Sequence, residues 1–161
     1  MTITEDLDAC QEMADVSDRI LVSDPDIAPA DFLRALGRLV AGIDPGVEGI
    51  LDLARGGENA VYGRGFRPEF DDGSRGQARH FAGTAASVAI VGGRVTGFVA
   101  HTFLDPADTA DGRLTTAAID FATQILDETL PLSDASTWIV ENLCVSAPEA
   151  ATIRIDPPPT T

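Results

Sequence analysis

Hydrophobic residues near the start of the chain recur every three or four positions, as they do on one face of a helix. This stripe predicts a first helix that ends near Ser23, and the segment Thr2–Glu5 has the capping-box pattern that opens helices. A second stripe, between Phe32 and Ile43, predicts a second helix that Asp44-Pro45 ends. The first stripe consists of Leu7, Cys10, Met13, Ala14, Ile20 and Leu21.

Three further segments carry helical signals. The Asp44-Pro45 pair that ends the second helix also opens a short third one over residues 45–54, with Asp as the cap and Pro at the first helical position. Residues 114–126 show the clearest apolar stripe of the chain, and Pro131 stops this helix. A last helix runs from about Asp134 to Cys144, and we expect Trp138 to anchor it in the core.

Residues 77–104 fit two patterns. The β-branched residues on both sides of Gly92-Gly93 fit a β-hairpin over residues 86–103. The spacing of Phe81, Ala85, Val88 and Val95 also fits a helical stripe, and Ala is abundant. We favour two helices that break near Gly92-Gly93 and keep the hairpin as the alternative.

These elements predict an all-α fold. The chain has 161 residues, the size of one domain. We expect a single compact domain of about six helices over residues 1–144, followed by an extended or disordered Pro-rich tail over residues 145–161. With the hairpin at 86–103 instead, the fold would be α+β.

A long loop rich in Gly, Arg and aromatic residues separates the third and fourth predicted helices. Residues 55–81 hold five of the eleven Arg residues, and residues 56–76 hold six Gly. Long loops within compact domains are often binding loops. We therefore expect this loop to recognise a protein partner through Tyr62, Arg64, Phe66, Arg67, Arg75 and Arg79.

The Arg residues of this loop also suit two further roles. Guanidinium groups bind carboxylates and phosphates, and Gly63 and Gly65 would let the backbone approach a small anion closely. The plainer role is that these Arg residues pair with acidic residues of the same chain. Nearby, Asp71 and Asp72 precede Gly73, a sequence typical of a turn rather than of a catalytic carboxylate pair.

Charge is concentrated at the two ends of the chain, and the net charge is −15. Residues 1–31 hold nine acidic residues and one Arg, whereas residues 32–104 hold seven acidic residues and eight Arg. An acidic field repels phosphate backbones, so we exclude nucleic acid as a partner. Apolar runs are too short to span a membrane, and the acidic start lacks a secretory signal, which predicts a cytoplasmic protein.

Two cysteines, Cys10 and Cys144, lie far apart on apolar segments. An exported protein would have them as a disulfide that closes a long loop, but buried thiols are the expectation for a cytoplasmic one. The sequence has no motif of a metal or cofactor site.

The candidate catalytic residues are His80, His101 and Asp105. If Gly92-Gly93 is a tight bend between antiparallel helices, the two imidazole rings would lie close together. His101 and Asp105 are one helical turn apart, so the carboxylate can orient the imidazole. The competing interpretation is that each His is partly buried and hydrogen-bonded to a carbonyl group.

A short stretch of sequence resembles a known group of domains. Arg79-His80-Phe81-Ala82, followed about twenty residues later by Ala100-His101-Thr102, resembles the Arg-His-Ala and Ala-His-Glu signatures of small helical domains of bacterial polymorphic-toxin-type proteins. The resemblance covers about 25 residues, and Thr102 stands where those domains have Glu. The resemblance adds no known activity. The alternative to the non-catalytic binding domain that we favour is a small hydrolase-like or toxin-type domain that uses His80, with His101 and Asp105 in support.

Overall fold

Five α-helices make up most of the described part of the chain. The computed structural model describes residues 7–42, 61–91 and 108–146, and within these ranges it contains no β-strand. The prediction of an all-α domain is therefore confirmed. The helices are α1 (Ala9–Ser23), α2 (Pro29–Ala41), α4 (Gln77–Val91), α6 (Ala110–Leu126) and α7 (Ala135–Leu143), with short 3-10 turns at η1 (Pro68–Phe70) and η2 (Leu132–Asp134).

The helix ends follow local capping chemistry. At the start of α1, the Asp8 carboxylate accepts a hydrogen bond from the Gln11 backbone amide. The predicted capping box at Thr2–Glu5 is therefore wrong as the start of this helix, although its end at Ser23 is confirmed. At the C-terminal end of α2, Gly42 takes the left-handed conformation that ends many helices.

The alternative of a β-hairpin over residues 86–103 is wrong for its first half, because α4 is helical to Val91. Ala is abundant in this segment, and both faces of α4 are buried from Ala82 to Val88, so the β-branched residues sit in a helix interior rather than in a strand. The second half of the hairpin lies outside the described residues. The predicted third helix, the predicted helix after Gly92-Gly93 and the tail from residue 147 onward also lie outside the described residues.

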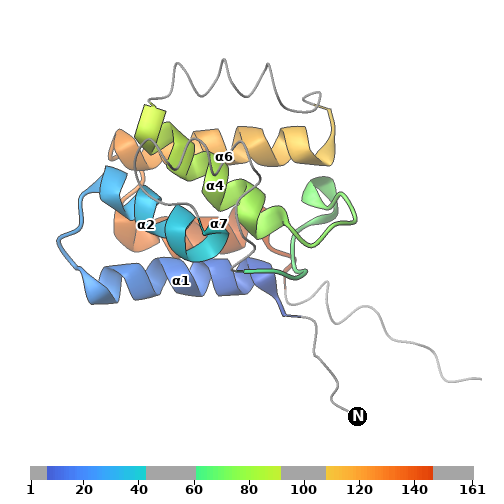
Figure 1. Cartoon of the computed structure of the whole chain (residues 1–161), viewed down its shortest axis with the longest axis horizontal. Helices are drawn as coiled ribbons and strands as arrows, with labels where there is room; N and C mark the ends of the chain where they lie inside the picture. Colours follow the sequence, from blue (N-terminus) through green and yellow to red (C-terminus); the bar gives the residue numbers. More distant parts are fainter. Residues whose placement is uncertain (1–6, 43–60, 92–107, 147–161) are drawn as a thin grey trace, which may run out of the picture.

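The helices form two groups that share one apolar core. Figure 1 shows α4 crossing the middle of the molecule, with α6 along one edge and α1 along the opposite edge. Helix α4 packs on α2 and α6, whereas α1 packs mainly on α7. Where α2 meets α4, a methyl group on Gly37 would overlap with the Ala86 side chain, so the missing side chain sets how closely the helices approach.

Three aromatic rings from α4, α6 and α7 meet, two of them inside the core and Trp138 half-buried against it. Phe81 of α4 and Phe121 of α6 are fully buried, with ring centroids 5.3 Å apart. Trp138 of α7 lies against both, 5.0 Å from Phe121 and 6.3 Å from Phe81. Trp138 thus joins the two helix groups, which confirms its predicted role as the anchor of the last helix. Among the described helices, none combines the length and apolar character needed to cross a membrane.

Candidate functional site

An extended segment, residues 61–67, runs between the start of α1 and the end of α7. We name it the clasp segment. On one side the Arg64 amide donates to the Leu7 carbonyl, and the Arg64 carbonyl accepts from the amides of Ala9 and Cys10. On the other side the Arg67 amide donates to the Leu143 carbonyl, and the Gly65 carbonyl accepts from the Val145 amide. The clasp segment therefore joins two helices that are far apart in the sequence (Figure 1).

Two glycines allow this close approach. A methyl group at Gly63 would overlap with the Leu7 carbonyl oxygen, and one at Gly65 would overlap with the Asp8 carboxylate. Gly65 also has a φ of 103°, which disfavours any residue with a side chain. The sequence predicted close backbone approach at these glycines, but the partner is the start of α1 rather than an added anion. The acidic group that lies beside Gly65 is the Asp8 carboxylate of the same chain.

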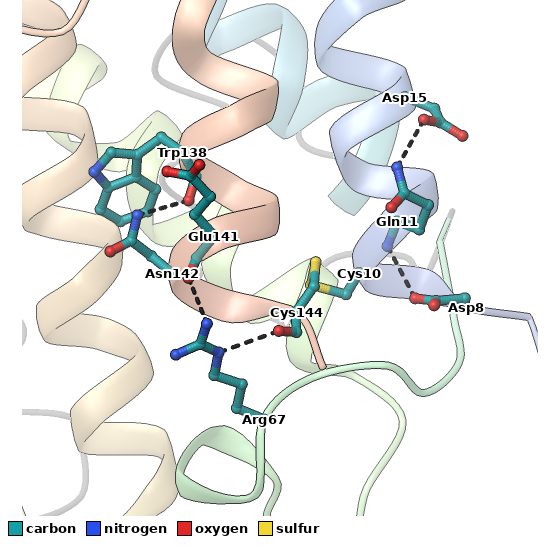
Figure 2. Close-up of a disulfide and its surroundings, with 9 residues drawn as sticks. All are labelled: Asp8, Cys10, Gln11, Asp15, Arg67, Trp138, Glu141, Asn142 and Cys144. Atoms are coloured by element: carbon teal, nitrogen blue, oxygen red, sulfur yellow. Dashed lines mark hydrogen bonds between the residues drawn. A yellow bond between two sulfur atoms is a disulfide. The ribbon is translucent and has the colours of Figure 1, made fainter. Parts of the chain in front are cut away.

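The two cysteines form a disulfide beside the clasp segment. Cys10 lies in the first turn of α1, Cys144 follows the last residue of α7, and their Cα atoms are 5.5 Å apart. Both residues are buried (Figure 2). The expectation of buried thiols is therefore wrong. Sequence alone does not tell which segments become neighbours, and here α1 packs on α7 and brings the two sulfurs together.

Arg67 fixes the end of α7. Its guanidinium group donates from Nε to the Cys144 carbonyl, at 3.1 Å, and from Nη2 to the Glu141 carbonyl. Figure 2 shows this side chain directed at the last turn of α7, next to the disulfide. The carbonyls at the C-terminal end of a helix lack partners within the helix, and a cation there also complements the helix dipole. Arg67 is thus engaged inside the molecule.

The structure divides the six predicted binding residues into buried and exposed groups. Phe66 is buried in the core, and Arg67 bonds to α7. Tyr62 and Arg64 are exposed, and Tyr62 retains 50% of its accessible surface. Arg75 and Arg79 are half-buried, and both have interaction partners. The Arg75 carbonyl accepts from the Gly63 amide, so the backbone next to Tyr62 is fixed from this side too.

Leu7, an exposed residue beside the clasp segment, was not among the predicted binding residues. Leu7 keeps 49% of its surface exposed, and its carbonyl bonds to the clasp segment two residues after Tyr62. The sequence suggested a helical position facing the core, because Leu7 falls on the apolar stripe of the first helix. The exposure of Leu7 could have been predicted only if the start of the helix had been placed at Asp8, because Leu7 then lies outside the helix.

The remainder of the loop is a compact turn on α4 and α6. The Gly73 amide donates to the Asp71 carboxylate and the Ser74 amide to that of Asp72, while Gly73 has a φ of 82°. The prediction of an Asp-Asp-Gly turn is confirmed. The Gln77 side-chain amide donates to both carboxylates, at 3.2 Å and 2.7 Å, and so attaches the turn to the first residue of α4.

Partial burial and hydrogen bonding act in opposite directions on Asp72. Burial penalises the charged carboxylate, but hydrogen bonds outweigh it and lower the pKa of Asp72 below its usual value. The largest of these contributions come from the hydroxyl and backbone amide of Ser74. Asp72 is therefore held as an anion by the turn and has a structural part in it.

His80, the first candidate catalytic residue, pairs with a helix side chain. Its Nε2 lies 2.7 Å from Oγ1 of Thr115 on α6, in the interface between α4 and α6. His101 and Asp105 lie outside the described residues. A His within this distance of a hydroxyl is the usual arrangement of a base and a nucleophile. Here, however, Thr115 is only 5% exposed, so its hydroxyl is closed to a substrate.

No residue cluster in the described ranges resembles a metal centre, since three or more His, Cys, Asp or Glu residues do not come together there. Comparison of the chain with protein-family models, with curated proteins and with solved structures finds no match. The resemblance to toxin-type helical domains therefore stays a prediction.

Proposed function

We propose that this chain is a non-catalytic domain that binds a protein partner through a surface centred on Tyr62. The observation that carries the proposal is an exposed Tyr on a backbone that is fixed on both sides. The amide of Val61 donates to the Val40 carbonyl, and the amides of Gly63 and Arg64 donate to Arg75 and Leu7. Most exposed loops lack this degree of main-chain bonding.

An aromatic side chain on a fixed backbone suits protein recognition. Tyr and Arg are enriched among the residues that contribute most to protein interfaces, and a backbone that is already held in place loses little entropy on binding. Tyr62 and Arg64 are two residues apart, and the Leu7 carbonyl accepts from the Arg64 amide, so an aromatic ring, an aliphatic side chain and a guanidinium group are carried by adjoining backbone. We name these three residues the Tyr62 surface.

The charge of the chain narrows the class of partner. A net charge of −15 opposes binding to nucleic acid, since phosphate groups would be repelled. A protein partner with an apolar contact for Tyr62 fits the Tyr62 surface.

The catalytic alternative, with His80 supported by His101 and Asp105, ranks second. Its one described element is His80, and the hydroxyl that His80 contacts is buried. An enzyme of this kind would require a substrate to reach His80, which is half-buried between α4 and α6.

A photo-crosslinking amino acid at position 62 tests the binding function. Position 22, near the other end of α1, is the matched control, because Val22 keeps 82% of its surface exposed. In cells of the source organism, we expect a discrete adduct from position 62 that is absent from position 22 and is lost with Arg64→Glu. An adduct of twice the chain mass would identify the partner as a second copy.

The identified partner is then purified and titrated calorimetrically. We expect Tyr62→Ala to weaken binding by about 30-fold or more, as truncation of a central interface residue does, and Tyr62→Phe to keep most of the affinity. Equal labelling from positions 62 and 22, or an unchanged affinity of the Tyr62→Ala variant, would overturn the proposal.

A further inference from the structure

The disulfide and the clasp segment form one connected unit. The main-chain bonds of residues 64–67 to the start of α1 and the end of α7 lie within three residues of a cysteine: at Leu7, Ala9 and Cys10 on one side, and at Leu143 and Val145 on the other. The Arg67 guanidinium group bonds to the Cys144 carbonyl itself. The position of the clasp segment therefore depends on where the two cysteines hold their helices.

Hydrogen bonds alone give this unit little cooperativity. Residues 8 and 64 form an isolated parallel bridge, and residues 66 and 144 form an isolated antiparallel one, so the clasp segment has no continuous ladder with either neighbour. Paired extended segments need several strands and an apolar face to be stable in water. Val61 and Phe66 pack into the core, and the covalent bond between the two flanking segments adds the constraint that the bridges lack.

We infer that formation of the Cys10–Cys144 disulfide assembles the Tyr62 surface, so that the oxidised chain binds its partner and the reduced chain does not. This inference rests on the proposed function and adds its regulation. In the oxidation step, both thiols lose their protons and two electrons in total pass to a disulfide of an oxidising dithiol protein, which becomes a dithiol. The two sulfurs then share the new S–S bond.

Burial makes the oxidised state persistent. Cys10 is fully buried and Cys144 is 4% exposed, so an external thiolate does not reach either sulfur while the domain is folded. Disulfides that persist are typical of oxidising compartments. The chain thus gains its binding surface on entering such a compartment and keeps it there.

Hydrogen exchange tests the effect on the clasp segment without any partner. The oxidised chain is compared with wild type refolded in a reducing dithiol and with the Cys10→Ala/Cys144→Ala variant, which cannot re-oxidise. We expect the amides of Arg64, Arg67 and Val145 to lose protection about tenfold or more, while amides in the middle of α4 and α6 stay protected. The α4 and α6 amides also report whether each sample is folded.

Crosslinking from position 62 is then repeated on oxidised and reduced chain with the same partner. We expect the adduct only from the oxidised chain. Unchanged protection of the three clasp amides, loss of protection throughout α4 and α6, or an equal adduct from the reduced chain would each overturn the inference. If oxidised chain gives no adduct, the proposed function fails, and the exchange data still decide whether the disulfide holds the clasp segment.

Discussion

The α2–α4–α6 group and the clasp region are stabilised in different ways. The first is held by apolar side chains that fit closely, such as Phe81 against Phe121 and Gly37 against Ala86. The clasp region, which consists of the first turn of α1, residues 61–67 and the end of α7, is held by main-chain hydrogen bonds, the Arg67 side chain and a disulfide, in addition to the burial of Val61 and Phe66. The first arrangement requires a regular pattern of side chains, whereas the second requires only a few particular residues.

This difference has a functional consequence. Packed helices bury their side chains and leave few for recognition, whereas a segment fixed through its backbone can present side chains to solvent. Tyr62 is exposed although its neighbours in sequence are fixed. The clasp region thus keeps Tyr62 exposed on a backbone that is held in place.

The largest expected effect is on the packed group. Phe121→Ala removes a fully buried ring that contacts Phe81 and Trp138, and we expect the free energy of unfolding to fall by about 3–5 kcal/mol. Thr116→Ala, at an exposed position of the same helix, serves as the control and should change it by less than about 0.5 kcal/mol. Urea unfolding followed by circular dichroism measures both. A loss below about 1 kcal/mol for Phe121→Ala would contradict the role of the ring cluster.

We expect a smaller loss of stability from a change in the clasp region. Gly63→Ala places a methyl group against the Leu7 carbonyl, which is backbone and has little room to move. We expect a loss near the upper end of the range for overpacking, about 1–3 kcal/mol, together with faster exchange of the Arg64 amide. Stability equal to wild type would show that the start of α1 is free to shift away from the clasp segment.

Gly37→Ala is the matching change in the packed group. Its methyl group would overlap with the Ala86 side chain, but Ala gains about 0.5–1 kcal/mol over Gly in a helix, so the net loss should lie at the lower end of the same range. Here the clash is with a side chain, so Ala86→Gly in the same chain should recover part of the loss. Strictly additive unfolding energies in this double-mutant cycle would contradict the contact.

The smallest effect concerns pH. The folded chain lowers the pKa of Asp72, so this carboxylate stabilises the fold above its unfolded pKa, and the contribution is lost as the pH falls through the lowered value. Stability should therefore decrease less steeply on acidification in Asp72→Asn than in wild type. Ser74→Ala removes the hydroxyl that bonds to Asp72 and accepts from the Gly76 amide, keeps the Ser74 backbone amide, and should give an intermediate slope. Identical slopes for all three chains would argue against the turn as the cause.

The sequence predicted the packed group better than the clasp region, for a physical reason. Helices such as α6 bury one face, so their apolar residues recur with the helical period and can be recognised. The clasp segment contacts α1 and α7 largely through its backbone, which leaves no period in the side chains. Gly63 and Gly65 indicated a close approach, but only the fold reveals that the Leu7 carbonyl and Asp8 carboxylate are what they approach.

Contacts between residues that are far apart in the sequence were also not predicted. The Cys10–Cys144 bond joins residues 134 positions apart, and no local pattern relates them. For a similar reason the sequence did not predict that Arg67 and Phe66 contact the end of α7. Their partner in both cases is Cys144, which lies far along the chain.

The position of the clasp segment in the chain also affects how the protein is made. Its partners at residues 7–10 leave the ribosome before it, but those at residues 143–145 follow long after it, when α4 and α6 have already been synthesised. A nascent chain thus carries Cys10 as an unpaired thiol until Cys144 has been synthesised. Closure at Cys144 comes after all five described helices have been made, and until then Cys10 is open to pairing with the wrong thiol.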